Sequence, residues 1–367
     1  MENFINHLEI NNFKSIKKLK LDSKRVNVFI GKPNVGKSNI LEAISILNPQ
    51  NFVSKALEHL GIRLEGFNEL HYDNDQTNNI RIEMAMDTDC HYKLDLFKLV
   101  KDSSEITKGV YLTYQQIKDL QRKYTDIPGE WDIIQSFWHY LLKEDGFEYI
   151  ANGYPGTVSS KQNSENLFAI KKYEFRDSYS FDVGAMDDEI HLFIRNNLFD
   201  VVSRLDSLKQ KIVEIFKNDY GLQFVFSKVD KKFFVQKFVD GYVYQYPYSS
   251  VADTFQRFIF YLAAIESNSN AVLIFEEPEV HSFPPYVKEL AERIVSKKDN
   301  QYFISTHSPY MLQTLVEELD DSELNVILTY YKDYQTHVKI LTPEELKEVQ
   351  DFSINLFFNL TKFEPNA

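Results

Sequence analysis

The segment GKPNVGKS at residues 31–38 constrains this chain more than any other feature of its sequence. It matches the pattern Gly-x4-Gly-Lys-Ser, in which glycines let backbone N–H groups curve around phosphate oxygens. The apolar run at 26–30 predicts a buried strand before it, and apolar residues at helical spacing over 38–47 predict a helix after it. Because the positive end of a helix attracts anions, this strand–loop–helix order predicts a nucleotide-phosphate site.

Each position of this phosphate-binding loop, or P-loop, has an expected task. Lys37 should reach the β- and γ-phosphates of ATP, and the Ser38 hydroxyl should bind Mg²⁺. An ordinary glycine-rich β–α turn is the alternative, but it does not explain a Lys-Ser pair at the start of the helix. The residues expected to contact the nucleotide are Gly31, Asn34, Val35, Gly36, Lys37, Ser38 and Asn39.

The C-terminal half carries a second signal, an apolar run at 271–275 that ends in Glu276 and Glu277. Such a strand places two carboxylates at the edge of a sheet. Beside a P-loop, Glu276 is expected to hold Mg²⁺ through water, and Glu277 to orient and deprotonate an attacking water molecule. Alone, an apolar strand with acidic residues at its end is more often a strand and a solvated turn, but a P-loop in the same chain reverses that preference.

The third signal is the sequence STHSP at 305–309, at the end of a predicted strand over 302–305. His307 could hydrogen-bond the γ-phosphate and report its presence. A lone histidine is usually structural, yet this one falls where the other two motifs converge.

Together the three motifs resemble those of the ATP-binding-cassette (ABC) ATPases of the SMC/RecF/OLD group. The shared blocks are LEINNFKS at 8–15, EPEVH at 277–281 and STHSP at 305–309, in the same order. The resemblance covers residues 5–50 and 245–330. It implies an α/β fold: an ABC-type P-loop ATPase head with an N-terminal antiparallel β subdomain and an inserted mixed α+β, largely helical region.

The resemblance also assigns roles by position. Lys37 and Ser38 would serve phosphate and Mg²⁺, Glu276 and Glu277 would serve metal and water, and His307 would be the switch histidine.

Members of the group close two heads around two ATP molecules, and a signature loop of one subunit contacts the γ-phosphate held by the other. The counterpart of this signature loop in the present sequence places Asp253 and Thr254 among the expected nucleotide contacts. Either residue could instead simply cap the following helix. The Ser-Ser-Gly of the family's signature loop aligns with the sequence ADT at 252–254. Without the glycine, a close approach of the backbone to phosphate is harder. This departure weakens the expectation of efficient hydrolysis. Gln76 lies in a plausible region for the Q-loop glutamine.

The chain is expected to divide into four parts. These are the N-terminal half of the head with the P-loop (1–100), an inserted domain (101–245), the C-terminal half of the head (246–342) and a helical tail (343–367).

Periodicity predicts further elements in each part. Strands are expected at 7–13, 16–21, 80–86, 92–100, 222–246, 324–330 and 336–341. Helices are expected at 114–124, 131–143, 200–218, 255–265, 284–295 and 309–318, and a polar loop at 152–166.

Composition limits the partners. The 367 residues carry a formal net charge of −13, which excludes wholesale coating with nucleic acid. A local basic cluster remains, either a patch for phosphate or, as we favour, a lysine-protected sheet edge. Its members are Lys14, Lys17, Lys18, Lys20, Lys24 and Arg25.

One cysteine, Cys90, rules out an intrachain disulfide framework and fits a reducing cytoplasm. Residues 1–12 lack a signal-peptide pattern, and the most apolar helix, 255–265, is too short to span a bilayer. We therefore expect a cytoplasmic protein with no membrane partner.

The insertion lacks the sustained heptads of a long coiled-coil arm, and few residues follow the last motif, so no OLD-type nuclease domain is expected. The leading hypothesis is an ATPase that dimerises or assembles further on ATP and regulates a protein effector, such as a nuclease or toxin in a bacterial anti-phage defence system. A RecF-like DNA-repair ATPase that binds duplex DNA is the alternative, and a nucleotide-regulated scaffold with negligible hydrolysis is a third.

Overall fold

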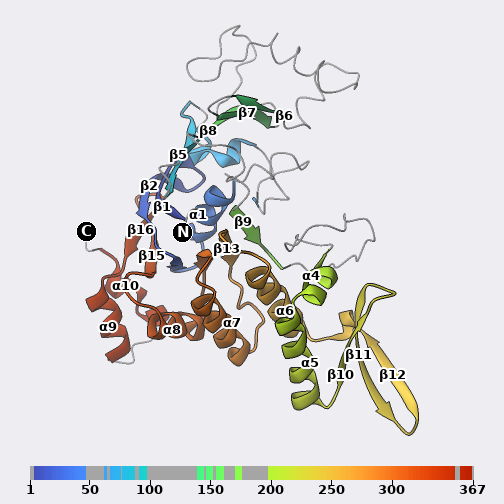
Figure 1. Ribbon diagram of the computed structural model, residues 1–367. Helices are drawn as coiled ribbons and strands as arrows, with labels where there is room; N and C mark the ends of the chain where they lie inside the picture. Colours follow the sequence, from blue (N-terminus) through green and yellow to red (C-terminus); the bar gives the residue numbers. More distant parts are fainter. Residues whose placement is uncertain are drawn as a thin grey trace, which may run out of the picture.

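The computed structural model describes residues 4–46, 62–63, 67–75, 77–86, 91–96, 139–143, 146–151, 154–160, 170–175, 197–351 and 356–365. Two sheets and a group of helices make up most of this part of the chain, and a smaller third sheet lies beside α5 (Figure 1).

A six-stranded central sheet carries the motifs. Its order is β16-β15-β3-β14-β13-β9, and all neighbouring pairs are parallel except β15 with β16. The strands are β3 (Val26–Ile30), β9 (Ile170–Tyr173), β13 (Val272–Glu276), β14 (Gln301–Ser305), β15 (Leu324–Lys332) and β16 (Gln335–Ile340). Because parallel strands end at the same edge, the loops after β3, β13 and β14 meet there.

Both faces of this sheet are covered, which is why its inner strands read as continuous apolar runs. Ile274 and Phe303 face a cluster that includes α1 (Lys37–Ser45), whereas Leu273 and Phe275 face a larger cluster with helices from the C-terminal half. The helices of that half are α6 (Asp253–Glu266), α7 (Pro284–Ser296), α8 (Pro309–Glu318), α9 (Pro343–Asp351) and α10 (Leu360–Phe363), with 3₁₀ turns at Tyr248–Ser250 and Leu356–Phe358.

The N-terminal strands form a separate antiparallel sheet of order β2-β1-β4-β5-β8-β7-β6. Its strands are β1 (Ile5–Phe13), β2 (Ile16–Asp22), β4 (Ile80–Met86), β5 (His91–Leu96), β6 (His139–Lys143), β7 (Gly146–Ala151) and β8 (Tyr154–Ser160), and 3₁₀ turns at Phe67–Leu70 and Tyr72–Asn74 precede β4. The buried Gln301 side chain joins this sheet to the central one, since it bonds both the N–H and the carbonyl of Ile5 at 2.8 Å.

A third sheet packs against two helices at the other end of the molecule (Figure 1). The helices are α4 (Leu198–Arg204) and α5 (Asp206–Tyr220), and the strands are β10 (Gln223–Ser227), β11 (Lys232–Val239) and β12 (Tyr242–Pro247). The base of this sheet is buried, but every residue of β12 is exposed.

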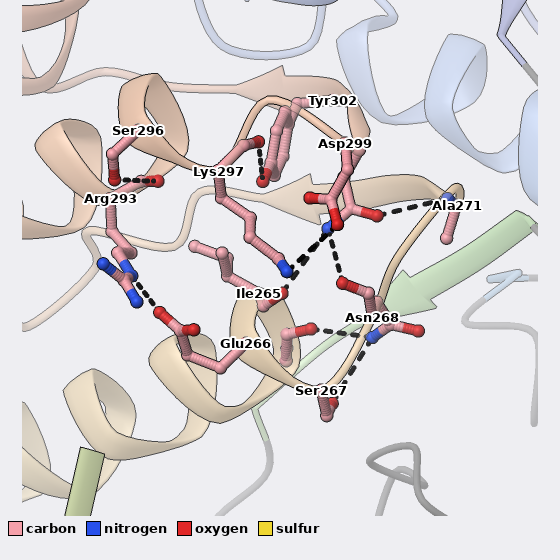
Figure 2. Close-up of polar contacts among 12 residues, drawn as sticks. Ile265, Glu266, Ser267, Asn268, Ala271, Arg293, Ser296, Lys297, Asp299 and Tyr302 are labelled. Carbon is pink, nitrogen blue, oxygen red and sulfur yellow. Dashed lines mark hydrogen bonds and ion pairs between the residues drawn. The ribbon is translucent and has the colours of Figure 1, made fainter. Parts of the chain in front are cut away.

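A buried polar network closes the turn between α6 and β13 (Figure 2). The Asn268 amide donates to the Ala264 carbonyl at 2.7 Å, and the Asn300 side chain accepts from the Ala271 N–H at 3.1 Å. Asn300 also donates to the Asn268 carbonyl at 2.9 Å. These bonds satisfy backbone groups that the end of a buried helix would otherwise leave unpaired.

Most predicted elements are present, and three predictions were wrong. Residues 139–143 form β6 rather than the end of a helix, and 154–160 of the predicted polar loop form β8. The single helix expected over 200–218 is broken at Leu205, whose ψ of 83° is not helical. The helix expected at 114–124 lies outside the described residues, and the domain boundaries remain predictions.

Candidate functional site

The P-loop has a backbone that only glycine fits at two positions. Gly31 has a φ of 154°, and a Cβ there would lie 2.3 Å from the Thr329 carbonyl oxygen. Gly36 has a φ of 98°, and its Cβ would lie 2.1 Å from Thr336 Oγ1. A side chain at Gly31 would therefore clash with backbone, and one at Gly36 with the side chains of Thr336 and Ser15. The glycines thus set the curvature that turns N–H groups toward a phosphate.

Side chains from two sheets hold this loop in place. Thr336 of β16 donates from its hydroxyl to the Val35 carbonyl at 2.9 Å and lies 2.6 Å from Ser15 Oγ. Asn39 donates its amide to the same Ser15 oxygen at 2.7 Å. The serine of the β1–β2 turn and a threonine from the end of the chain therefore fix the loop from outside.

Lys37 points back along the loop. Its ammonium donates to the carbonyls of Gly31 at 3.1 Å and Lys32 at 2.9 Å. Burial lowers the pKa of the Lys37 ammonium, and the carboxylates of Glu277, Glu276 and Glu279 oppose that decrease. The lysine is thus held in the concave side of the loop by weak neutral acceptors.

Glu276 ends β13 beside the P-loop. Its carboxylate lies 2.5 Å from the Arg63 guanidinium and 3.0 Å from the Lys172 ammonium, and it is hydrogen-bonded to the Ser38 side chain. Burial raises the pKa of this carboxyl, but Lys172, Ser38 and Arg63 together outweigh burial and hold the pKa below its usual value. Glu276 is therefore ionised.

Glu277 and His307 form a pair across the ends of β13 and β14. Glu277 Oε1 lies 3.4 Å from His307 Nε2. The hydrogen bond with His307 is the largest cause that lowers the pKa of Glu277. Glu277 has a φ of 44°, unusual for a residue with a side chain, and its N–H donates to the Ser305 carbonyl at 2.9 Å. The strained backbone turns this carboxylate away from the strand direction.

A third carboxyl group, that of Glu279, stabilises the loop that carries His307. Glu279 Oε1 accepts from the His307 N–H at 2.6 Å and from the Thr306 hydroxyl at 2.8 Å. Burial raises the pKa of Glu279, although these two donors act in the opposite direction.

These groups line one cavity of about 740 Å³. Of the predicted site residues, it gathers Asn34, Val35, Gly36, Lys37, Ser38, Asn39, Glu276, Glu277 and His307. Gly31 lies at the foot of the loop and outside this lining. The three motifs, far apart in the sequence, thus converge as their spacing predicted.

The two signature-loop residues are not part of that cavity. Asp253 accepts from Arg257 at 2.8 Å and lies 3.3 Å from His281, while Thr254 Oγ1 accepts from the Phe283 N–H at 2.8 Å. Neither side chain makes an N-terminal cap bond, because Ala252 occupies the N-cap position of α6. The capping alternative is therefore wrong, and both residues fasten α6 to the loop after β13.

Sequence reasoning missed several residues of the cavity. Arg63, Glu174, Phe175 and Arg257 belong to the lining. Arg63 contacts Glu276, as does Lys172 from outside the lining. Arg257 follows the signature loop directly and was within reach of a motif search. Lys172, Glu174 and Phe175 carried no signal, because β9 lies within the predicted insertion yet pairs with β13. Arg63 belongs to no motif. Gln76, the Q-loop candidate, lies outside the described residues.

The oxygen donors here suit a magnesium ion. Ser38 and Glu276 supply a hydroxyl and a carboxylate that are hydrogen-bonded to each other. Mg²⁺ prefers oxygen ligands of this kind, and phosphate and water oxygens would complete its coordination shell. In the described part of the chain, no group of three or more His, Cys, Asp or Glu side chains is arranged to hold a metal ion. Among the described helices, none has the length and apolarity needed to cross a membrane.

The fold is similar to that of solved SMC heads. An SMC head bound to the C-winged helix domain of ScpA superposes with a TM-score of 0.52 and 14% sequence identity, over 93% of this chain and 99% of that one. An SMC head with an extended coiled coil from Pyrococcus furiosus, bound to the C-terminal domain of ScpA, gives 0.49 and 12%, over 95% and 99%. No curated protein matches the sequence.

The first of these similarities confirms the predicted fold class, a mixed α/β ABC-type head with an N-terminal antiparallel sheet and a mixed central sheet. Residues 26–313 match the family described as "AAA domain, putative AbiEii toxin, Type IV TA system". The chain belongs to this family of P-loop ATPase domains.

Proposed function

We propose that this protein binds ATP with Mg²⁺, hydrolyses it to ADP and phosphate, and uses the nucleotide state to control a partner protein. The observation that carries the proposal is the convergence of Lys37, Ser38, Glu276, Glu277 and His307 on one cavity of about 740 Å³. A cavity of this size holds a nucleoside triphosphate.

The P-loop supplies the binding energy for the phosphates. Its curved backbone, fixed by Ser15 and Thr336, presents N–H groups at the start of α1, where the helix dipole favours an anion. Lys37 exchanges its two carbonyl contacts for phosphate oxygens, which are stronger acceptors for an ammonium. Ser38 and Glu276 would hold Mg²⁺, which neutralises phosphate charge when bound.

Glu277 is the proposed general base. His307 keeps its carboxylate ionised, so Glu277 can accept a proton from a water molecule aligned with the γ-phosphate. His307 is the partner that orients Glu277 and can contact the γ-phosphate at the same edge of the sheet. Because Glu279 holds the His307 N–H, the histidine loop keeps its position relative to β13.

Asp253 and Thr254 serve a second copy of the head in this proposal. They lie outside the chain's own cavity, and Arg257 ties Asp253 to the start of α6. A loop whose side chains lie outside the lining of its own nucleotide cavity is available to contact the γ-phosphate bound by another copy. ATP would then close two heads, or a larger assembly, around the nucleotide.

The effector hypothesis draws on the comparisons. The SMC heads above were solved with a bound ScpA domain, and the family description names a toxin of a toxin–antitoxin system. By analogy, this head controls a nuclease or toxin, as part of a cytoplasmic anti-phage defence system. Direct DNA binding gains no support, because Lys14, Lys20 and Arg25 of the basic cluster are paired with Glu42, Glu9 and Glu323.

The substitution Glu277→Gln tests the proposal. It removes the base but keeps the shape of the site, so hydrolysis should fall at least about 100-fold while ATP binding remains. Light scattering should then show an ATP-dependent increase in mass, larger than for the wild type, whose closed state is short-lived. Glu292→Gln, on the exposed face of α7, is the matched control and should behave as the wild type.

Three results would contradict the proposal. Unchanged turnover in Glu277→Gln would remove this residue as the base, and an unchanged mass with ATP bound would remove head association. A copurified neighbouring gene product that stays bound in both nucleotide states without a change in its activity would argue against effector control.

A further inference from the structure

Strand β9 places a lysine where the pattern of the sheet calls for an apolar residue. β9 runs parallel to β13, with Ile170 opposite Val272 and Lys172 opposite Ile274. Ile170, Val272 and Ile274 all belong to the apolar cluster that includes α1. Lys172 shares their face by alternation, and its side chain is only 4% exposed.

The Lys172 ammonium reaches the end of β13 along this face. It lies 3.0 Å from Glu276 Oε2, while Arg63 occupies the other carboxylate oxygen, Oε1, at 2.5 Å. The Ser38 hydroxyl is bonded to the same carboxylate. The acidic side chain suited to hold a metal ion is therefore already paired with two cations.

The two cations differ in how firmly they are placed. Arg63 reaches Glu276 from an exposed position, with 69% of its side chain accessible. Lys172 is fixed by a strand of the central sheet and is surrounded by packed apolar residues. Burial of a charge is unfavourable unless it is paired, and an apolar side chain would fit this face without that cost. The positive charge at this position therefore has a use that packing does not supply.

We propose that Lys172 is a fixed counter-cation of Glu276 that keeps divalent metal ions out of the site until nucleotide phosphates arrive. A divalent ion at Ser38 and Glu276 would lie within a few ångströms of the ammonium and be repelled by it. Phosphate oxygens add several negative charges, so the net electrostatic effect of the site on a divalent ion becomes attractive. Metal and nucleotide therefore enter together. Lys172 is a positioning residue in this scheme, and the inference rests on the proposed ATP site.

Metal binding without nucleotide tests the inference directly. Mn²⁺ serves as the probe, because it accepts the same oxygen ligands and its free form is counted by electron paramagnetic resonance. Wild-type protein should bind Mn²⁺ weakly at this site, and Lys172→Met should bind at least about tenfold more tightly, equivalent to about 1.4 kcal/mol. Lys172→Arg keeps the charge and should resemble the wild type.

Two further variants locate the effect. Lys171→Met is the matched control, since Lys171 lies on the same strand but its ammonium bonds Asn268 on the opposite face, and its Mn²⁺ affinity should not change. Adding Glu276→Gln to Lys172→Met should abolish the gained binding. Lys172→Gln provides the same test if methionine impairs folding, as judged from the melting temperature.

The inference is overturned if Lys172→Met and Lys172→Gln bind Mn²⁺ no better than the wild type, or if the gain survives Glu276→Gln. ATP binding in excess chelator separates this result from the proposed function. If the wild type binds ATP but the Mn²⁺ results fail, only the role of Lys172 is lost. If the wild type binds no ATP with or without metal, the proposed ATP site itself fails.

Discussion

At the residue scale, the two carboxyl oxygens of Glu279 have unlike surroundings. One of its oxygens accepts from Thr306 and His307, and the other is buried with no hydrogen-bond partner in the described part of the chain. Burial raises its pKa above the value of about 4.3 expected in the unfolded chain. Ionisation therefore disfavours the folded state.

The sign of this effect predicts a pH dependence. The contribution of a carboxyl with a raised folded pKa is most favourable below its unfolded pKa and is lost as pH rises through the folded value. Glu279→Gln keeps an oxygen for both donors and does not ionise. The free energy of unfolding of this variant, relative to the wild type, should increase as the pH rises above about 4, by about 1.4 kcal/mol for each unit of pKa difference.

Chemical unfolding at several pH values measures the difference. Glu317→Gln on α8, where the side chain is exposed, should show no such trend. A difference between Glu279→Gln and the wild type that stays constant with pH would mean that Glu279 is charged in the folded protein at low cost.

At the element scale, the β11–β12 strand pair of the third sheet is buried at its base and exposed to solvent at its tip. Phe233 of β11 is 1% exposed and packs against Phe199, Phe224 and Tyr248. On the same face, Tyr244 of β12 is 47% exposed, opposite Lys237. The hairpin extends away from the helices at this point (Figure 1).

This contrast predicts unequal costs for the same type of substitution. Phe233→Ala should lower the free energy of unfolding by about 3–5 kcal/mol, because it leaves a cavity among aromatic rings. Tyr244→Ala should change it by less than about 0.5 kcal/mol. Urea unfolding checks both, and a loss at Tyr244 as large as that at Phe233 would mean that the hairpin tip is covered in solution.

Elements with a strong apolar period were predictable, and others were not. The strand at Val272–Glu276 and the helix at Pro309–Glu318 have the patterns of buried elements, and both are where the sequence placed them. Strand β8, with the sequence YPGTVSS, contains proline, glycine and small polar residues that favour turns. It is a strand because β5 and β7 pair with it on both sides, a tertiary effect that its own sequence does not encode.

The same limit applies to the candidate site. Lys37, Ser38, Glu276 and His307 belong to motifs with fixed spacing, so the order of strands in a parallel sheet was enough to bring them together. Lys172 lies in a segment that resembles no motif, and its place beside β13 is known only from strand pairing.

At the scale of the whole molecule, ion pairs connect the N-terminal sheet to the edge of the central sheet that carries Glu276. Lys14, in the turn between β1 and β2, contacts Glu42 of α1 and donates to the Arg63 carbonyl at 2.7 Å. The Arg63 guanidinium lies 3.4 Å from Glu42 and 2.5 Å from Glu276. Arg63 is thus the one residue in this group that contacts both the N-terminal turn and the end of β13.

Binding of Mg-ATP beside Glu276 should therefore affect the β1–β2 turn through Arg63. In Glu277→Gln protein, Mg-ATP should slow amide hydrogen exchange at residues 31–39 and, to a smaller degree, at residues 13–16. Adding Arg63→Met should weaken the second effect and leave the first, because the P-loop contacts do not depend on Arg63 while Ser15 keeps its bonds to Thr336 and Asn39. Arg81→Met, which alters an exposed arginine of the same N-terminal sheet, should leave both effects unchanged.

Equal protection of residues 13–16 with and without Arg63 would show that the two sheets respond to nucleotide independently or through packing alone. The distinction matters because Gln301 also joins the sheets, by two hydrogen bonds to Ile5 at the opposite end of β1. Those bonds involve no charge near the nucleotide, so they can hold the sheets together but cannot sense a cation at Glu276. The arginine contact, in contrast, carries a charge beside Glu276. Coupling that survives its removal must come from the uncharged contacts of the same turn, in which Ser15 bonds Thr336 and Asn39, or from movement of α1.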